Sequence, residues 1–265
     1  MVSPQGSYRL FGFRGIDVSI HWSWFVAAFL MYSYAAQRGL DLNSFLAVFG
    51  SLFGIIVLHE FGHALACRSV GGEAKHIVLW PLGGVAIVSP PPRPGAVLWS
   101  IAAGPLVNVV LVPVFFGLYY GIYGTLTLPL DATRPQTFLY IIASINTALL
   151  VFNMLPIYPL DGGQIVQSIL WFFMGRAKSL HITAGIGLVI GGFAFLTALL
   201  GLSSSIPILN WINPLMLLLL SAFIAWQAWN GFRVARLLSL QEAYENESLD
   251  KALQRARDLT AGPPR

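Results

Sequence analysis

The sequence predicts an all-α polytopic membrane protein with about six transmembrane helices and a small re-entrant β-hairpin. Of the 265 residues, 56% are hydrophobic and 10% are charged, whereas soluble domains have roughly 25% charged residues. Six apolar stretches approach or reach the length that a helix needs to cross a ~30 Å hydrocarbon core: residues 21–36, 45–67, 97–123, 138–155, 182–200 and 214–234. Because there is too little charge to cover a globular surface, most of the chain is expected to face lipid.

The first apolar stretch, residues 21–36, is short for a span. Arg9 and Arg14 precede it, which is also the arrangement of a secretory signal peptide. His21 and the aromatic residues that follow it do not suit the apolar core of a signal peptide. We therefore expect a retained first span, preceded by a cytosolic segment of residues 1–20.

Residues 76–90 are apolar but too short to cross a membrane. Two β-rich runs flank a Gly-Gly pair, a pattern typical of a hairpin. Non-helical backbone at membrane depth must be buried in protein or line a cavity. The sequence therefore favours a re-entrant hairpin, with an interfacial loop as the alternative.

The remaining chain completes a simple domain organisation. Residues 21–235 form a membrane-embedded domain with a core of about residues 45–163, and residues 236–265 read as a polar, helical, cytosolic tail. If the N-terminus is cytosolic, Arg38 and Arg134 are the only two of the 15 Lys and Arg residues on the outer side. The positive-inside rule then places both termini in the cytosol.

Composition also excludes several classes of function. The pI near 9.4 could suggest a nucleic-acid partner, but the basic residues are scattered between apolar stretches and form no cluster. We therefore expect no nucleic-acid binding. The single cysteine, Cys67, excludes an intrachain disulfide and a CxxC redox or zinc motif.

One motif in the second apolar stretch carries chemistry: His59-Glu60-Phe61-Gly62-His63. Residues four apart share a helix face, so both imidazoles can hold one zinc ion while Glu60 takes a proton from a water molecule. Ionisable side chains within membrane helices are costly, and they usually mark a functional site. A satisfied polar patch or an ion pathway is the alternative reading.

A catalytic zinc site needs a third protein ligand. Asp161 follows a Pro-interrupted segment after the fourth stretch, where we expect irregular backbone, and its carboxylate would leave one position of the metal open. Alone, an Asp before Gly-Gly reads as a turn residue. Cys67 shares the face of His59 and His63 but lies eight residues from His59, ~12 Å along the helix axis, which is too far to join them at one ion.

Together these pieces resemble the site-2 protease family of intramembrane metalloproteases. The matching residues are HEFGH at 59–63, Gly83-Gly84, Gly104-Pro105-Leu106 with Asn108, NMLPIYPLDGG at 153–163, and His21-Trp22-Ser23. The resemblance implies one zinc ion per chain held by His59, His63 and Asp161, with Glu60 as base. It also implies single-span membrane protein substrates, often cut first by a site-1-type protease, and it leaves the oligomeric state open.

Weaker candidates surround this centre. Asn108 or Asn153 could stabilise an oxyanion or position the substrate, although interhelical hydrogen bonding is a common alternative for such amides. Asn146 reads as structural. In the hairpin, Gly83, Gly84 and Val85 could offer a strand edge to an unwound substrate, because main-chain pairing gives affinity without demanding a sequence.

Three other functions fit parts of the pattern. A membrane metal or proton transporter could use the His/Glu cluster as a relay, but it would need ionisable residues along several spans. A prenyl-protein-processing type of peptidase would need a Glu ligand in a later span, and none of those spans contains one. A catalytically dead scaffold is disfavoured because His59, Glu60, His63 and Asp161 are all present.

The predicted topology also gives the side on which the site opens. The second and fourth stretches both run from the outside to the cytosol, so His59, His63 and Asp161 would meet at one level. At 1.5 Å per residue, His63 and His59 lie roughly 8 and 13 Å before Arg68, the cytosolic end of the second stretch. We therefore expect the site to open towards the cytosol.

Overall fold

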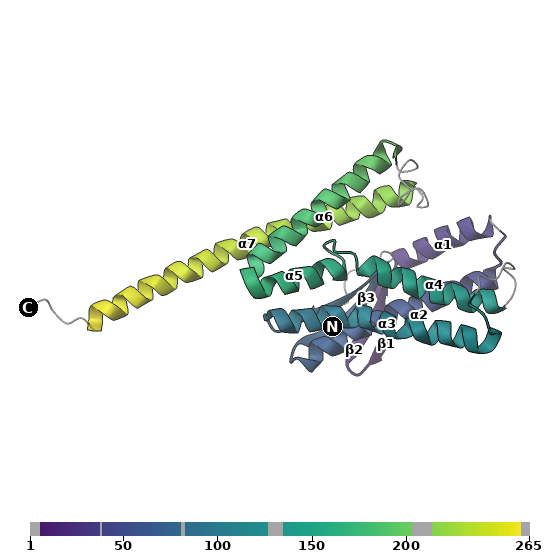
Figure 1. The fold of residues 1–265 in the computed structure, drawn as a ribbon, viewed down its shortest axis with the longest axis horizontal. Helices are drawn as coiled ribbons and strands as arrows, with labels where there is room; N and C mark the ends of the chain where they lie inside the picture. Colours follow the sequence, from purple (N-terminus) through teal and green to yellow (C-terminus); the bar gives the residue numbers. More distant parts are fainter. Residues whose placement is uncertain (1–5, 38, 81–82, 127–134, 203–213, 261–265) are drawn as a thin grey trace, which may run out of the picture. The chain divides into compact units, whose positions relative to one another are not determined.

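The computed structural model describes residues 6–37, 39–80, 83–126, 135–202 and 214–260. The chain divides into two compact units, residues 1–156 with 160–165 and residues 157–159 with 166–265. The described part of the first unit holds a four-stranded sheet with four helices, and helices α5 to α7 belong wholly or mainly to the second (Figure 1).

The sheet has the strand order β1 (Ser7–Phe13), β2 (Ile16–His21), β3 (Glu73–Trp80) and β4 (Gly83–Ser89). Strands β1 and β2 form one antiparallel hairpin, and β3 and β4 form another. Strands β2 and β3 pair in parallel, joined by a crossover through α1 (Ser23–Ala36) and α2 (Leu42–Ser69). The hairpin predicted within residues 76–90 is confirmed, although its tip at 81–82 lies outside the described residues and its re-entrant position stays a prediction.

The first hairpin lies mostly in residues 1–20, the predicted N-terminal segment, for which no strands were predicted. Its two-residue turn, Arg14-Gly15, has positive φ at both positions (48° and 71°), as the tight turn that suits twisted strands requires. Arg68, at the end of α2, donates to the carbonyl oxygens of Gly15 (2.8 Å) and Ala74 (2.9 Å). The guanidinium thereby ties the end of α2 to both hairpins.

The core of the first unit lies between the sheet and α2. The side chains that meet there are almost fully buried: Ile16, Val18, Ile77 and Leu79 from the strands, and Ile56, Ala64 and Cys67 from α2. Asp41 begins α2 by accepting hydrogen bonds from the backbone N–H groups of Asn43 (2.9 Å) and Ser44 (3.0 Å).

Helices α3 (Pro94–Tyr123) and α4 (Pro135–Asn153) complete the first unit. Helix α3 approaches α2 very closely at Gly62. A Cβ added to this glycine would lie 2.6 Å from the carbonyl oxygen of Ala103. Small residues at such contacts let membrane helices pack backbone to backbone. The contact brings the HEFGH face of α2 against α3.

Two features of the second half of the chain differ from the prediction. Helix α5 (Asp161–Met174) was not expected, and α7 (Pro214–Thr260) runs unbroken from the predicted last span into the predicted tail. In the second unit, α6 (Arg176–Leu199) packs along α7 (Figure 1). Tyr158 sits between them, since a Cβ at Gly187 would meet its carbonyl oxygen at 2.4 Å and one at Gly231 its ring at 2.6 Å.

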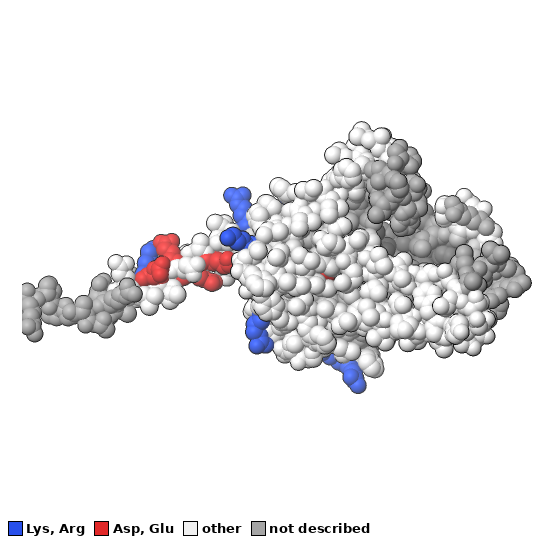
Figure 2. All heavy atoms as spheres, viewed as in Figure 1, with Lys and Arg blue, Asp and Glu red and all other residues white. Residues whose placement is uncertain are grey.

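In the part of the chain that the structure describes, four helices are long and apolar enough to cross a membrane, namely α2, α3, α6 and α7. Helix α1 and residues 137–153 of α4 are also apolar but shorter. Four of the six predicted spans are therefore supported by length, and the number six stays a prediction. Figure 2 shows few charged side chains over the helices on the face in view, while acidic side chains gather on the exposed C-terminal part of α7.

Candidate metal centre

Two histidines on one face of α2 form the centre of the site. His59 and His63 are each 6% exposed, and their Nε2 atoms lie 3.1 Å apart. The rings are nearly perpendicular, at 84°, with centroids 4.7 Å apart. The i, i+4 spacing on α2 therefore brings one nitrogen of each ring to the same point.

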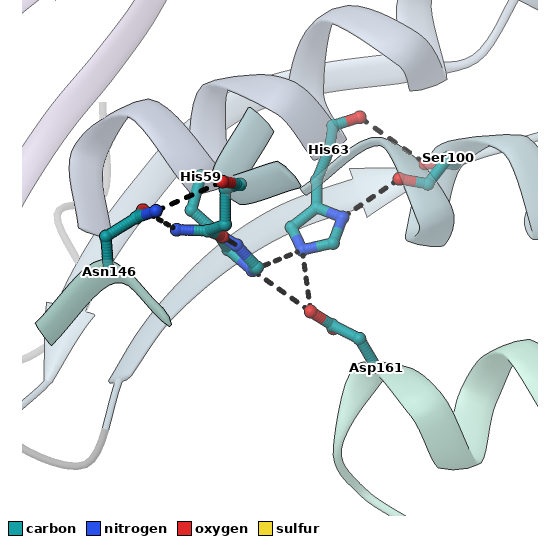
Figure 3. A network of polar contacts seen from close by, with 6 residues as sticks. His59, His63, Ser100, Asn146 and Asp161 are labelled. Atoms are coloured by element: carbon teal, nitrogen blue, oxygen red, sulfur yellow. Dashed lines mark hydrogen bonds and ion pairs between the residues drawn. The ribbon is translucent and has the colours of Figure 1, made fainter. Parts of the chain in front are cut away.

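The other nitrogen of each ring is held by an oxygen acceptor (Figure 3). His59 Nδ1 lies 2.5 Å from Asn108 Oδ1, and His63 Nδ1 lies 2.9 Å from the carbonyl oxygen of Ser100. The Asn108 amide is itself fixed, because its Nδ2 donates to Asn146 Oδ1 (2.8 Å) and Asn146 Nδ2 donates to the Asn108 carbonyl oxygen (3.0 Å). Helices α3 and α4 thus hold the ring orientations that α2 presents.

These contacts determine the tautomer of both histidines. A carbonyl oxygen accepts hydrogen bonds and cannot donate, so each Nδ1 must carry a proton. In a neutral ring, the Nε2 atom then presents its lone pair. Metal-binding histidines are usually oriented in this way, by a hydrogen bond from the second ring nitrogen to an oxygen.

Asp161 brings a third electron-rich atom to the same point. It is the first residue of α5, which corrects the expectation of irregular backbone there, and an acidic side chain suits a helix N-terminus. Its Oδ2 lies 3.0 Å from His59 Nε2 and 3.4 Å from His63 Nε2, and this buried atom has no hydrogen-bond partner among the described residues. The glycine that follows allows the close approach, because a Cβ at Gly162 would lie 2.4 Å from the carbonyl oxygen of Leu155.

The three atoms fit a divalent metal. Their separations of 3.0, 3.1 and 3.4 Å are close to the roughly 3.3–3.6 Å expected between ligands that stand 2.0–2.2 Å from a tetrahedral zinc ion. A proton on one Nε2 would satisfy one of these contacts, whereas a single cation satisfies all three. Gly104 on α3 keeps the point clear, since a Cβ there would lie 2.3 Å from His63 Nε2 and 2.8 Å from His59 Nε2.

Glu60 stands beside this point as a further buried carboxylate, 5% exposed. One of its oxygens and a nitrogen of each histidine lie within 4.8 Å of one another. A carboxylate at that distance can take a proton from a water molecule bound between the three atoms. The arrangement can therefore hold a metal ion and activate water next to it.

The structure brings most of the predicted site residues together, but not all of them. His59, Glu60, His63, Asp161 and Asn108 meet, and Asn146, interpreted as structural, supports Asn108. Asn153 is the last residue of α4 and has no part in these contacts. The buried Cys67 lies apart, with its Sγ 3.5 Å from the carbonyl oxygen of Glu73.

Sequence analysis missed the role of Ser100, and no sequence signal marks it, because any residue has a backbone carbonyl. Gly83, Gly84 and Val85 belong to β4, paired with Trp80, Leu79 and Val78 of β3. In the strand order, β4 stands at one end of the sheet.

Comparison with known proteins gives a consistent result. Residues 47–199 of this chain match the family described as Peptidase family M50. A zinc metalloprotease of Methanocaldococcus jannaschii is 31% identical over 238 residues, 87% of this chain and 62% of the relative. A Synechocystis sp. relative is 31% identical over 257 residues, 92% of this chain and 64% of the relative. The chain thus spans slightly less than two thirds of the length of these curated relatives.

Among solved structures, the site-2 protease from Methanocaldococcus jannaschii has a similar fold, with a TM-score of 0.63 and 27% identity. The match covers 85% of this chain and 95% of that chain.

Removing the predicted third ligand, Asp161, should strongly weaken metal binding. We predict that purified Asp161→Ala loses zinc, with affinity reduced by at least 10²-fold, because two imidazoles alone make an incomplete site. Metal content by mass spectrometry, after dialysis against a weak chelator, measures this. Cys67→Ser is the matched control and should keep one zinc ion per chain. A zinc-free Cys67→Ser with a zinc-loaded Asp161→Ala would overturn the assignment.

Proposed function

The chain belongs to peptidase family M50, and from that premise we propose that it is an intramembrane zinc metalloprotease that hydrolyses peptide bonds of transmembrane substrates. The convergence of His59 Nε2, His63 Nε2 and Asp161 Oδ2 beside Glu60 is the observation that supports this most strongly. The apolar helices and the family make the chain an integral membrane protein. As the resemblance implies, we infer single-span membrane proteins as substrates, delivered after a first cut by a site-1-type protease.

In the proposed mechanism each polar residue of the site has a role. His59, His63 and Asp161 would hold zinc, which lowers the pKa of a bound water molecule and polarises the scissile carbonyl. Glu60 takes the proton that water loses as its oxygen attacks the carbonyl carbon. The same carboxyl then gives that proton to the amine that leaves as the C–N bond breaks.

The amides have different roles in this proposal. The side-chain oxygen of Asn108, Oδ1, accepts from His59 Nδ1, and its Nδ2 donates to Asn146 Oδ1, so Asn108 orients the ring of a proposed ligand. We assign it this role rather than oxyanion stabilisation. Asn153, half-buried at the end of α4, is the remaining candidate for an oxyanion donor or a substrate-positioning residue.

The rival transporter function receives less support. A relay needs ionisable groups along a path. Among the described helices, the almost fully buried histidines and acids are His59, Glu60 and His63, with Asp161 beside them. They form one cluster rather than a series.

We further propose that the main chain of Gly83, Gly84 and Val85 pairs with an unwound substrate. Strand β4 is an end strand whose one neighbour in the described sheet is β3, and it also packs against α2, which carries the histidines. An exposed strand edge is a ready template for an added strand. The substrate must be extended to bind there, which also uncovers its peptide carbonyls for attack.

The proposed orientation places both termini and the opening of the site in the cytosol. Positive charge supports it, because with this topology the outer side carries Arg38 and Arg134, both outside the described residues, against 13 other Lys and Arg residues. Helix α5 follows the ligand Asp161 on the cytosolic side in this arrangement. Water would enter, and cut fragments would leave, on that side.

Glu60→Gln should bind zinc normally and lose cleavage by on the order of 10²-fold or more, because the amide cannot accept the proton of water. Membranes that contain the wild type or the variant are compared by proteomics of released fragments, followed by kinetics on a substrate so identified. Glu242→Gln, at an exposed position of α7, is the control. Cleavage at the wild-type rate by a zinc-loaded Glu60→Gln would refute the proposed mechanism.

Replacing Val85 or Ile87 by Pro should slow cleavage at least tenfold without releasing zinc, because each change removes a main-chain N–H from β4. Consecutive N–H groups of a strand point to opposite edges. Ala86→Pro therefore removes an N–H from the other edge of β4 than Val85→Pro and Ile87→Pro do. Comparing the variants separates loss of pairing with substrate from loss of pairing with β3. If all three zinc-loaded variants cut at the wild-type rate, the edge does not bind substrate.

Single cysteines in a Cys67→Ser background test the orientation. Lys178→Cys should react with an impermeant maleimide from the cytosolic side, and Gln37→Cys from the outer side. Both positions are exposed, so the reagent can reach them. Labelling of Lys178→Cys from outside would invert the topology.

A further inference from the structure

His21 is a buried histidine outside the metal centre, at the end of β2. Its side chain has little exposure, with the residue 8% exposed. Ser23, the first residue of α1, donates its backbone N–H to His21 Nδ1 (3.3 Å), and Ser23 Oγ lies 2.6 Å from the same nitrogen. On the other side, a Cβ at Gly6 would lie 3.1 Å from His21 Nε2. The imidazole is therefore fixed where the sheet meets α1.

The imidazole stacks on Trp80. The two rings are nearly parallel, at 14°, with centroids 3.9 Å apart. Trp80 is the last residue of β3 and pairs with Gly83, the first residue of β4. The stack therefore lies at the end of the hairpin where the proposed substrate edge begins.

The stack adds a side-chain contact between β2 and β3 just beyond their last main-chain pair. The parallel pairing of β2 with β3 ends at Ile20 and Leu79. His21 and Trp80 are the next residue of each strand, and their rings make contact where that pairing stops. Trp80 is 41% exposed, so the imidazole supports only part of its surface. Without that support, the end of β3 is held on the β2 side by the main-chain pairs that precede Trp80, the last of them Ile20 with Leu79.

We infer that His21 is a positioning residue for the substrate-binding edge of β4 and that it acts through Trp80. The inference rests on the proposed role of Gly83, Gly84 and Val85. A loosened edge is ready to pair with an extended substrate for a smaller fraction of the time, which weakens substrate binding by that fraction. Binding of an extended substrate depends on the stack of His21 on Trp80, whereas metal binding by His59, His63 and Asp161 does not depend on it.

Hydrogen–deuterium exchange of residues 83–89, in the full chain with zinc bound, tests the anchor without needing a substrate. His21→Ala and Trp80→Ala should each speed exchange there by about fivefold, the scale of one aromatic pair. Zinc content should be unchanged. With a cleaved substrate, KM should rise by a similar factor and kcat should change less than twofold.

Rescue and coupling distinguish a positioning role from general damage. His21→Phe keeps a ring on Trp80 and should stay within twofold of the wild type. The double variant His21→Ala/Trp80→Ala should exchange no faster than either single variant. His181→Ala is the control, because that histidine also packs on an aromatic ring, Phe232 at 3.7 Å between centroids, but in the second unit.

Unchanged exchange in His21→Ala, additive effects in the double variant, or loss of zinc would each overturn the inference. Since exchange is measured without substrate, the anchor can fail while Glu60-dependent cleavage persists. The reverse result, a wild type that cuts nothing while exchange responds to His21→Ala, would refute the proposed function instead.

Discussion

Three electron-rich atoms, two imidazole nitrogens and one carboxylate oxygen, face one another at about 3 Å in the buried interior of the first unit. Such a cluster is stable in an apolar surrounding when a cation fills it and when the polar groups behind it are satisfied. The structure meets the second condition with hydrogen bonds from three helices. His63 uses the Ser100 carbonyl, and His59 uses the Asn108–Asn146 pair. The placement of α3 and α4 against α2 follows from this requirement as much as from apolar packing.

Close approach of the backbones is a further condition for the cluster. A Cβ at Gly62 would strike α3, one at Gly104 would occupy the space between the histidines, and one at Gly162 would strike the segment before α5. Each glycine serves a close approach, and none of the three has positive φ. Apolar association between helices gains little in lipid, so small residues that permit contact have a large share in deciding which helix faces meet. The site and the helix packing therefore depend on the same positions.

The limits of prediction from the sequence follow from this physics. The i, i+4 spacing of His59 and His63 is local, so it predicted directly that the two imidazoles meet, and the motif around Asp161 predicted the third atom. The Ser100 carbonyl carries no side-chain signal. The parallel pairing of β2 with β3 joins residues about 60 apart, which no local pattern specifies, although Arg14-Gly15 between two β-rich runs was a readable sign of the first hairpin.

Helices α5 and α7 differ from the prediction in different ways, because α5 was not expected and the predicted helical tail is continuous with the last predicted span. The prolines before Asp161 do end α4, but irregular backbone was expected at Asp161, which instead begins a new helix. In α7, the change from apolar to polar residues was taken as a boundary. A helix needs only backbone hydrogen bonds to continue, and no Pro or Gly after Gly231 interrupts it before Thr260.

Helix α2 connects the chemistry with the proposed substrate edge. His59 and His63 meet side chains of α3, while neighbouring side chains of the same helix, Ile56, Ala64 and Cys67, pack in the core shared with the sheet. Strand β4 also meets α2. A peptide paired to β4 would thus be placed with respect to the same helix that positions the metal ligands. A displacement of α2 would move both together and keep their spacing, whereas a displacement of the end of β3 and the start of β4 would change that spacing. The precision of cleavage should therefore depend most on what holds Trp80 and Gly83 in place, and on the β2 side this is the contact of Trp80 with His21.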